Sequence, residues 1–156
     1  MQEIADMVMD FYERKVQEKP GARRYLEYLS SRGVCLCVAT ASERRQVEPA
    51  LRRLGMWPLF HKVFTCTEAG VDKNTPEFWK HVASACGVLP EEMEVYEDAG
   101  HAMRSARKAG CRVTAVYDES SASEEAELRQ LADRYIRSYD ELTDAAEAAA
   151  REGQNL

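Results

Sequence analysis

The fold class is most clearly indicated by residues 76–117, whose sequence is PEFWKHVASACGVLPEEMEVYEDAGHAMRSARKAGCRVTAVY. Twice in this stretch an amphipathic helical pattern ends at a glycine, first Gly87 and then Gly110, and a short apolar run follows. Glycine readily takes the left-handed backbone conformation that ends many helices. Parallel strands need a helical crossover between them, so helices that alternate with apolar runs predict βαβ units.

The same unit occurs twice more on the N-terminal side of this stretch. In the first of these units, a helical pattern over 22–29 ends at Gly33 and is followed by the apolar run 34–39. In the second, a helical pattern over 47–54 ends at Gly55 and is followed by the apolar run 63–65. A further helix around 124–133, a short strand near 135–136 and an alanine-rich helix from Asp140 complete the pattern. Strands connected in this way are covered by helices on both faces. The predicted fold class is therefore α/β, with a doubly wound parallel sheet.

The first eighteen residues differ from the repeated units. Apolar residues there follow the helical i, i+3, i+4, i+7 spacing, and the Lys19-Pro20-Gly21 sequence breaks that helix. We expect residues 1–18 to form a separate helix joined by a hinge and residues 19–145 to form the core domain. Residues 146–156 should form a C-terminal helix and tail that fray.

Composition excludes several classes of partner. The net charge is −6, and no Lys/Arg cluster is interleaved with aromatic residues, so we expect neither a nucleic-acid nor an anionic-membrane surface. No stretch approaches the roughly 18 uncharged apolar residues of a membrane span, and the first ten residues are acidic rather than basic. These features predict a cytoplasmic location.

The five cysteines show no Cys-x-x-Cys spacing. Cys35 and Cys37 are two residues apart in an apolar run, which places both on one face of a strand. We expect buried free thiols rather than disulfides or a zinc site.

Candidate functional residues follow the apolar runs, because ligands of an open parallel sheet bind beyond the carboxyl ends of its strands. Thr40, Ala41 and Ser42 follow the first run. A hydroxyl and backbone N–H groups before a helix suit an anion such as phosphate. The alternative is that Thr40 or Ser42 only caps the helix.

Two further segments carry charged candidates. Lys73 precedes a helix that Pro76 opens, and it is either surface charge or a cation that neutralises a phosphoryl group. Glu97 and Asp98 follow the third run, and such carboxylates suit Mg²⁺, although Asp98 would also serve as a helix cap.

Together these segments resemble a known family. The order and spacing of VATAS (38–42), GVDKNTPEFW (70–79) and VYEDAGHAMRSARKAGC (95–111) resemble the second, third and fourth motifs of the haloacid dehalogenase (HAD) superfamily of phosphohydrolases. The similar branch has a helical cap and includes phosphoglycolate phosphatases and β-phosphoglucomutase. The resemblance runs from about Lys19 to Asp118, and it implies a HAD-like Rossmannoid core.

The resemblance implies a role for each candidate residue. Thr40 would hydrogen-bond the transferring phosphoryl group, with the Ala41 N–H assisting, and Lys73 would balance the negative charge. Asp98 would bind Mg²⁺, with Glu97 acting beside it through water. A phosphorylated small molecule would be the substrate. Asn74 stands where the family often has a proline, which puts the shape of the lysine loop in question.

The main departure concerns the first motif. In the family, a central strand ends in Asp-x-Asp, whose first aspartate attacks phosphorus, and no Asp-x-Asp occurs in this sequence. Asp6 and Asp10 are four apart in a helical pattern and do not replace it. The resemblance therefore implies an N-terminally truncated core that lacks its first, central strand, which the family places between the strands ending at Thr40 and Asp98.

Three expectations follow from this departure. The chain alone should be inactive as a phosphatase or phosphomutase, and its Mg²⁺ binding should be weak. The two strands beside the missing one should either pair directly or leave a gap, which a partner chain would fill. The alternative function is a non-catalytic HAD-fold binding module for a partner protein or a small anion.

Overall fold

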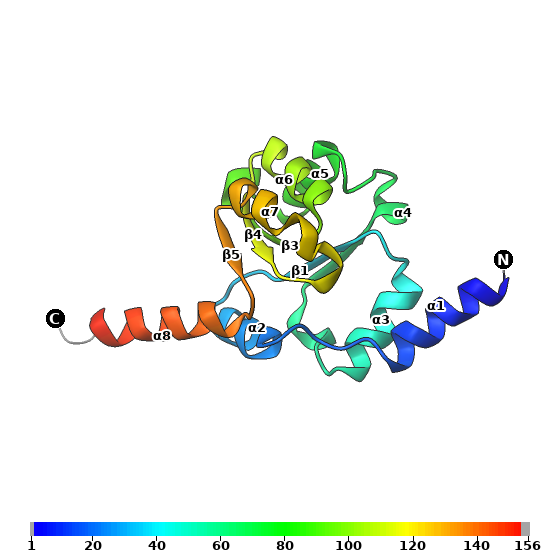
Figure 1. The fold of residues 1–156 in the computed structure, drawn as a ribbon, viewed down its shortest axis with the longest axis horizontal. Coiled ribbons are helices and arrows are strands. Elements are labelled where there is room, and N and C mark those ends of the chain that lie inside the picture. Colours follow the sequence, from blue (N-terminus) through cyan, green and yellow to red (C-terminus); the bar gives the residue numbers. More distant parts are fainter. Residues whose placement is uncertain (1, 154–156) are drawn as a thin grey trace. The chain divides into compact units, whose positions relative to one another are not determined.

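The computed structural model describes residues 2–153, with side chains from Met7 onward, and Figure 1 shows its helices and strands. The helices are α1 (Gln2–Arg14), α2 (Ala22–Ser31), α3 (Arg44–Arg53), α4 (Cys66–Ala69), α5 (Pro76–Cys86), α6 (Gly100–Ala109), α7 (Glu125–Leu131) and α8 (Asp140–Gly153). The strands are β1 (Cys37–Thr40), β2 (Lys62–Thr65), β3 (Glu94–Glu97), β4 (Arg112–Val116) and β5 (Arg134–Ile136). Three short 3₁₀ helices, η1 (Trp57–Leu59), η2 (Pro90–Glu92) and η3 (Glu119–Glu124), lie between them.

The predicted alternation of helices and strands is confirmed. The glycines that follow α2, α3, α5 and α6 all have positive φ, at 76°, 67°, 71° and 106° for Gly33, Gly55, Gly87 and Gly110. The separate N-terminal helix corresponds to α1 and the alanine-rich C-terminal helix to α8. The end of the tail that was expected to fray, residues 154–156, lies outside the described residues.

Contacts group the described chain into two compact units. The terminal unit contains the residues up to Thr65 and those from Tyr139 onward, and the central unit is Cys66–Ser138. The predicted division at residues 18 and 145 stays a prediction.

The terminal unit is built on the parallel pair β1–β2, in register from Cys37 opposite Lys62 to Thr40 opposite Thr65. Helix α1 packs on α3, and α2 packs on α8. The guanidinium of Arg24 on α2 reaches three carboxylates of α8, those of Asp140, Asp144 and Glu147, at 2.8–3.1 Å. The pKa of Arg24 is raised by its hydrogen bonds to these carboxylates.

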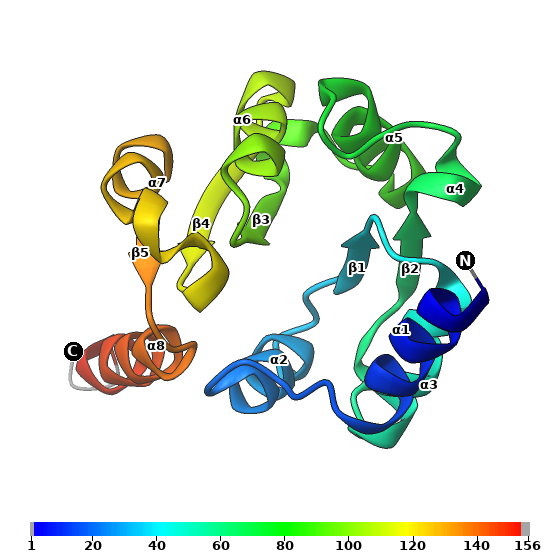
Figure 2. The ribbon, with the colours of Figure 1, turned by 45° about the vertical axis from the view of Figure 1, so that its right-hand side comes forward.

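The central unit is a three-stranded parallel sheet in the order β3–β4–β5, shown in Figure 2. Its core is apolar and fully buried, with Phe78 of α5, Met103 of α6 and Val113 of β4 at 0% exposure. Helices α5 and α6 pack on each other, and α6 covers β3 and β4. Sheet and helices thus bury one shared core, as α/β architecture requires.

The α/β class with parallel strands is confirmed, and the strands fall into two sheets. β1 pairs with β2, and β3 pairs with β4, while no ladder between described residues joins β1 to β3. The two arrangements expected for the strands beside the missing one both stay predictions.

The cysteines are free thiols, as expected, but most of them are not buried. All five thiols are free, and the Sγ atoms of Cys35 and Cys37 lie 4.0 Å apart, as same-face positions allow. Only Cys111 is buried, and Cys35 is exposed. The apolar run was expected to be strand from residue 34, but β1 begins at Cys37, so Cys35 lies in the exposed connection before it.

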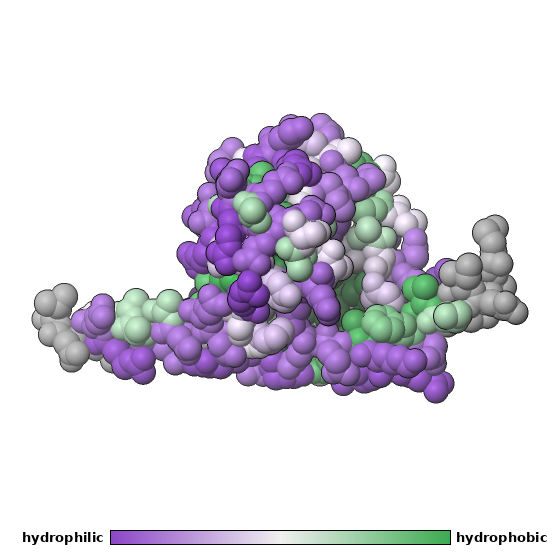
Figure 3. All heavy atoms as spheres, in the orientation of Figure 1, coloured by the Kyte–Doolittle hydropathy of each residue, from purple (hydrophilic) through white to green (hydrophobic). Residues whose placement is uncertain are grey.

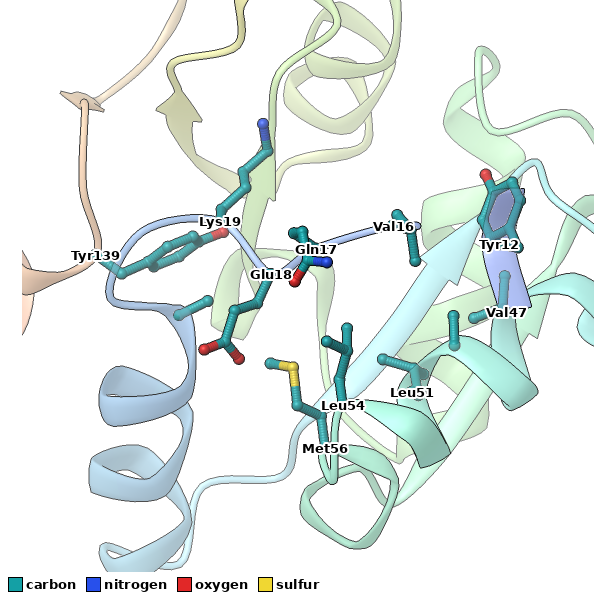
Figure 4. A pocket seen from close by; sticks show the side chains of 12 residues that line it. Tyr12, Val16, Gln17, Glu18, Lys19, Val47, Leu51, Leu54, Met56 and Tyr139 are labelled. Atoms are coloured by element: carbon teal, nitrogen blue, oxygen red, sulfur yellow. The ribbon is translucent and has the colours of Figure 1, made fainter. Parts of the chain in front are cut away.

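An apolar cavity of about 250 Å³ opens in the terminal unit, lined chiefly by the segment that follows α1 and by α3 and the residues after it (Figure 4). Val16, Val47, Leu51 and Leu54 contribute to its wall. A phosphate site needs converging donors, and the surface of this cavity is mainly hydrocarbon, although Gln17, Glu18 and Lys19 border it. The cavity is therefore a poor candidate for the phosphate site.

Apolar surface is also exposed on α1. Met7 and Phe11 are 72% and 51% exposed, and Figure 3 shows the apolar side chains of this helix at the molecular surface. Tyr12 and Val16, by contrast, are half-buried. Across residues 2–153, no helix has both the length and the apolar character needed to span a bilayer.

We predict that Gly21→Ala destabilises the protein more than Gly33→Ala. Both glycines have nearly the same positive φ, 74° and 76°, so both substitutions carry a backbone cost of about 1–3 kcal/mol. A Cβ at position 21 would lie 2.5 Å from the Asp140 backbone nitrogen, whereas one at position 33 would meet nothing within 4 Å. Urea unfolding of the two variants measures the difference, and equal losses of stability would show that α2 and α8 do not meet as described.

Candidate functional site

Lys73 lies in the loop between α4 and α5, and this loop is held by its own hydrogen bonds. The Asn74 N–H donates to Oδ1 of Asp72 at 2.9 Å, and the Thr75 hydroxyl donates to the Asp72 carbonyl at 2.8 Å. A proline at position 74 has no N–H for the first bond. The departure from the family pattern at Asn74 is therefore matched by a turn that uses the asparagine amide.

The ammonium of Lys73 forms a largely buried ion pair with Glu97 at the end of β3. Nζ lies 2.8 Å from Oε2 of Glu97, and the two side chains are 16% and 7% exposed. Oε1 of Glu97 accepts the N–H groups of Asp98 and Ala99 at 3.0 and 3.1 Å. Both carboxylate oxygens of Glu97 therefore have partners within the central unit.

The charge state of Glu97 follows from these contacts. Burial raises the pKa of its carboxyl group, but the Lys73 charge and the hydrogen bonds outweigh burial and hold the pKa below its ordinary value. Glu97 is thus an anion at neutral pH. Lys73 has a fixed negative partner rather than the solvent that surrounds a surface lysine.

Asp98 follows Glu97 directly and is half-buried. The N-cap of α6 is Ala99, so the alternative that Asp98 only caps this helix is not observed. An aspartate carboxylate at a strand end is a suitable Mg²⁺ ligand, since Mg²⁺ takes one or two carboxylates together with phosphate and water oxygens. Asp98 fits that requirement. The carboxylate of Glu97 already accepts from Lys73, Asp98 and Ala99, and its role beside the metal through water stays a prediction.

Thr40 and Ala41 belong to the terminal unit and follow β1. Oγ1 of Thr40 accepts the N–H of Ser42 at 3.0 Å, and a hydroxyl that accepts one hydrogen bond can still donate its own hydrogen. The Ser42 hydroxyl lies 2.7 Å from that of Tyr12 on α1. Ala41 is exposed.

The helix that follows these residues is capped by another residue. The N-cap of α3 is Glu43, which forms a capping box with Gln46. The alternative that Thr40 or Ser42 is the cap is therefore not observed. The hydroxyl of Thr40 instead stabilises the turn between β1 and α3.

Asp10 lies in α1, as its helical spacing predicted. Its carboxylate pairs with Arg14 one turn later at 3.0 Å, as i, i+4 partners do on an exposed helix. The side chain of Asp6 lies outside the described side chains.

The structure brings Lys73, Glu97 and Asp98 together within the central unit. Sequence reasoning missed two buried polar side chains beside them, Trp79 of α5 and Ser105 of α6, both of which hydrogen-bond the Lys73 carbonyl. Trp79 was not recognised from the sequence because it lies among the apolar residues of α5. A single serine among the alanines of α6 was the only other signal.

The chain is similar to known proteins of one family. Residues 2–116 match the family described as "Haloacid dehalogenase-like hydrolase". Among curated proteins, the chain is 29% identical over 119 residues to the "Phosphorylated carbohydrates phosphatase" of Thermotoga maritima, with 69% of this chain and 55% of the relative covered. The chain spans about half the length of the curated relatives it matches.

Solved structures share the fold. A HAD family hydrolase from Deinococcus radiodurans, with bound phosphate and sodium, superposes with a TM-score of 0.72 at 26% identity, covering 83% of this chain and 59% of that one. CbbY from Rhodobacter sphaeroides, in complex with phosphate, gives a TM-score of 0.77 at 24% identity, with coverages of 88% and 61%. The family match extends over well more than half of the sequence. The chain belongs to the haloacid dehalogenase-like hydrolase family.

Proposed function

We propose that this chain carries the phosphate-handling part of a hydrolase that acts on phosphate monoesters. The observation that carries the proposal is the Lys73–Glu97 ion pair, which holds a lysine ammonium largely away from water at the end of β3, where Asp98 follows in the chain. A family relative that acts on phosphorylated carbohydrates supports a phosphorylated sugar or a similar small molecule as the substrate.

Each candidate residue has a defined task in this proposal. In the terminal unit, the Thr40 hydroxyl is the proposed donor to a phosphoryl oxygen, and the backbone N–H of Ala41 would assist it. The ammonium of Lys73 neutralises the negative charge of the phosphoryl group. The electrostatic attraction between them is stronger in a site with little water. Glu97 keeps that ammonium in place. Asp98 is the residue that would hold Mg²⁺, and the ion, when bound, would supply further neutralisation of phosphate oxygens.

Binding and turnover are separate questions for this chain. Covalent phosphoryl transfer needs a nucleophile, and the Asp-x-Asp pair that provides it in the family is missing from the sequence. One carboxylate suited to the metal leaves most Mg²⁺ positions to water, so Mg²⁺ affinity should be weak without phosphate. We therefore propose binding without appreciable chemistry for the chain by itself.

A second candidate function rests on the same missing pair. A chain that retains the phosphate-binding residues but lacks the nucleophile would serve as a non-catalytic HAD-fold module that binds a small anion or a partner protein. A partner that completes the sheet also remains a prediction.

We predict negligible hydrolysis of p-nitrophenyl phosphate by this chain in the presence of Mg²⁺. Positioning and charge neutralisation cannot replace an absent attacking group. The assay measures p-nitrophenolate release by the wild-type chain and by Asp98→Ala, which should be equally inactive. Robust turnover that disappears in Asp98→Ala would show that this chain has a nucleophile of its own.

We also predict that the stabilising effect of Glu97 depends on pH. At pH 7, Glu97→Gln should lower the free energy of unfolding by about 3 kcal/mol, because it leaves the Lys73 ammonium largely buried without its anion. The folded pKa of Glu97 lies below its unfolded value, so its contribution is complete above about pH 4.5 and is lost as the pH falls through the folded pKa.

Urea unfolding of the wild type and Glu97→Gln at pH 7 and at successively lower pH provides the measurement. The stability difference should shrink below about pH 4.5. A difference that is constant with pH, or that grows on acidification, would show that Glu97 is not an ionised partner of Lys73.

A further inference from the structure

The backbone carbonyl of Lys73 receives hydrogen bonds from two buried side chains. The indole N–H of Trp79 lies 2.9 Å from this carbonyl oxygen, and the hydroxyl of Ser105 lies 2.5 Å from it. Trp79 belongs to α5 and Ser105 to α6, and each is 2% exposed. Two neighbouring helices therefore hold the same peptide group of the lysine loop.

The two side chains also contact each other. The Trp79 indole nitrogen is 2.7 Å from Oγ of Ser105, and the Ser105 hydroxyl is 2.8 Å from the Ala102 carbonyl. A hydroxyl donates one hydrogen and accepts at its lone pairs. The single indole N–H is therefore shared between Oγ of Ser105 and the Lys73 carbonyl, and the shorter distance, 2.5 Å, directs the serine hydrogen to Lys73. Hydrogen bonds linked in this way polarise one another.

The backbone N–H of Lys73 is also held. It donates to Sγ of Cys66 at 3.3 Å, at the start of α4. The N–H and the carbonyl of Lys73 thus both have partners within the central unit, which fixes the origin of the lysine side chain. A lysine stem has four flexible carbons, so a fixed backbone reduces the entropy lost when the ammonium is held beside Glu97.

We propose that Trp79 and Ser105 are positioning residues for Lys73. By holding its carbonyl, they direct the ammonium to the end of β3, where it meets Glu97. This inference rests on the proposed function only in the purpose it gives to Lys73, namely to face a phosphoryl group. The contacts themselves require no ligand.

The test measures how accessible the Lys73 amine is to a small acylating reagent, by mass spectrometry of the Lys73 peptide. In the wild-type chain Lys73 should react slowly, because it is paired and 16% exposed. In Ser105→Ala, and separately in Trp79→Phe, its reactivity should rise by about fivefold, the change expected from the loss of one buried hydrogen bond. Phenylalanine keeps an aromatic ring against Phe78, which Trp79 now contacts edge to face.

Thr114→Val is the matched control. Thr114 is fully buried on β4 of the same unit, and its hydroxyl donates to Glu94 at 2.8 Å. The variant loses a side-chain hydrogen bond without touching the lysine loop, so its Lys73 reactivity should equal that of the wild type. Thermal unfolding confirms that each variant is folded and ranks its loss of stability.

Two results would overturn the proposal. One is wild-type Lys73 reactivity in both Ser105→Ala and Trp79→Phe. The other is a rise in Lys73 reactivity in Thr114→Val equal to that in the two variants, which would show that general destabilisation causes the effect. Adding inorganic phosphate separates this inference from the proposed function. If phosphate does not lower the reactivity of Lys73 in the wild type, the proposed function fails. If the reactivity of Lys73 is still higher in the two variants, the positioning role stands.

Discussion

A lysine ammonium can be held largely out of water beside β3 because Glu97 places a carboxylate 2.8 Å away. The candidate site of the central unit depends on this ion pair. Glu97 also accepts the N–H groups of Asp98 and Ala99, so the same carboxylate shapes the turn that presents Asp98. Removing either charge would leave the other largely buried without its counter-charge, which costs more than an exposed ion pair contributes.

The sequence was sufficient to predict those features of the fold that depend on neighbouring residues in the chain. Gly87 and Gly110 ended helices where predicted, because a positive φ is accessible to glycine at little cost. Strand positions were correct to within about three residues, since apolar runs indicate a buried strand but not where its ladder begins. The run from residue 34 shows the limit: β1 starts at Cys37, and Cys35 is exposed as a result.

Features that depend on distant residues were out of reach. Lys73 and Glu97 are 24 residues apart, and Lys73 and Ser105 are 32 apart, so no periodicity relates them. The cap of α3 was missed for a different reason. Thr40, Ser42 and Glu43 all carry oxygen acceptors close to the helix start, and only backbone geometry selects Glu43. Likewise, the division of parallel strands into two sheets depends on pairing, which composition does not encode.

The central claim is that Lys73 faces phosphate. Nuclear magnetic resonance of ¹⁵N-lysine-labelled protein, titrated with inorganic phosphate, tests it most directly, with the Lys73 signal assigned by its absence in Lys73→Arg. We expect the Lys73 Nζ signal to shift and saturate while that of Lys108, in the last turn of α6, does not change. A Lys73 signal that stays constant while phosphate shifts other lysines would contradict the claim.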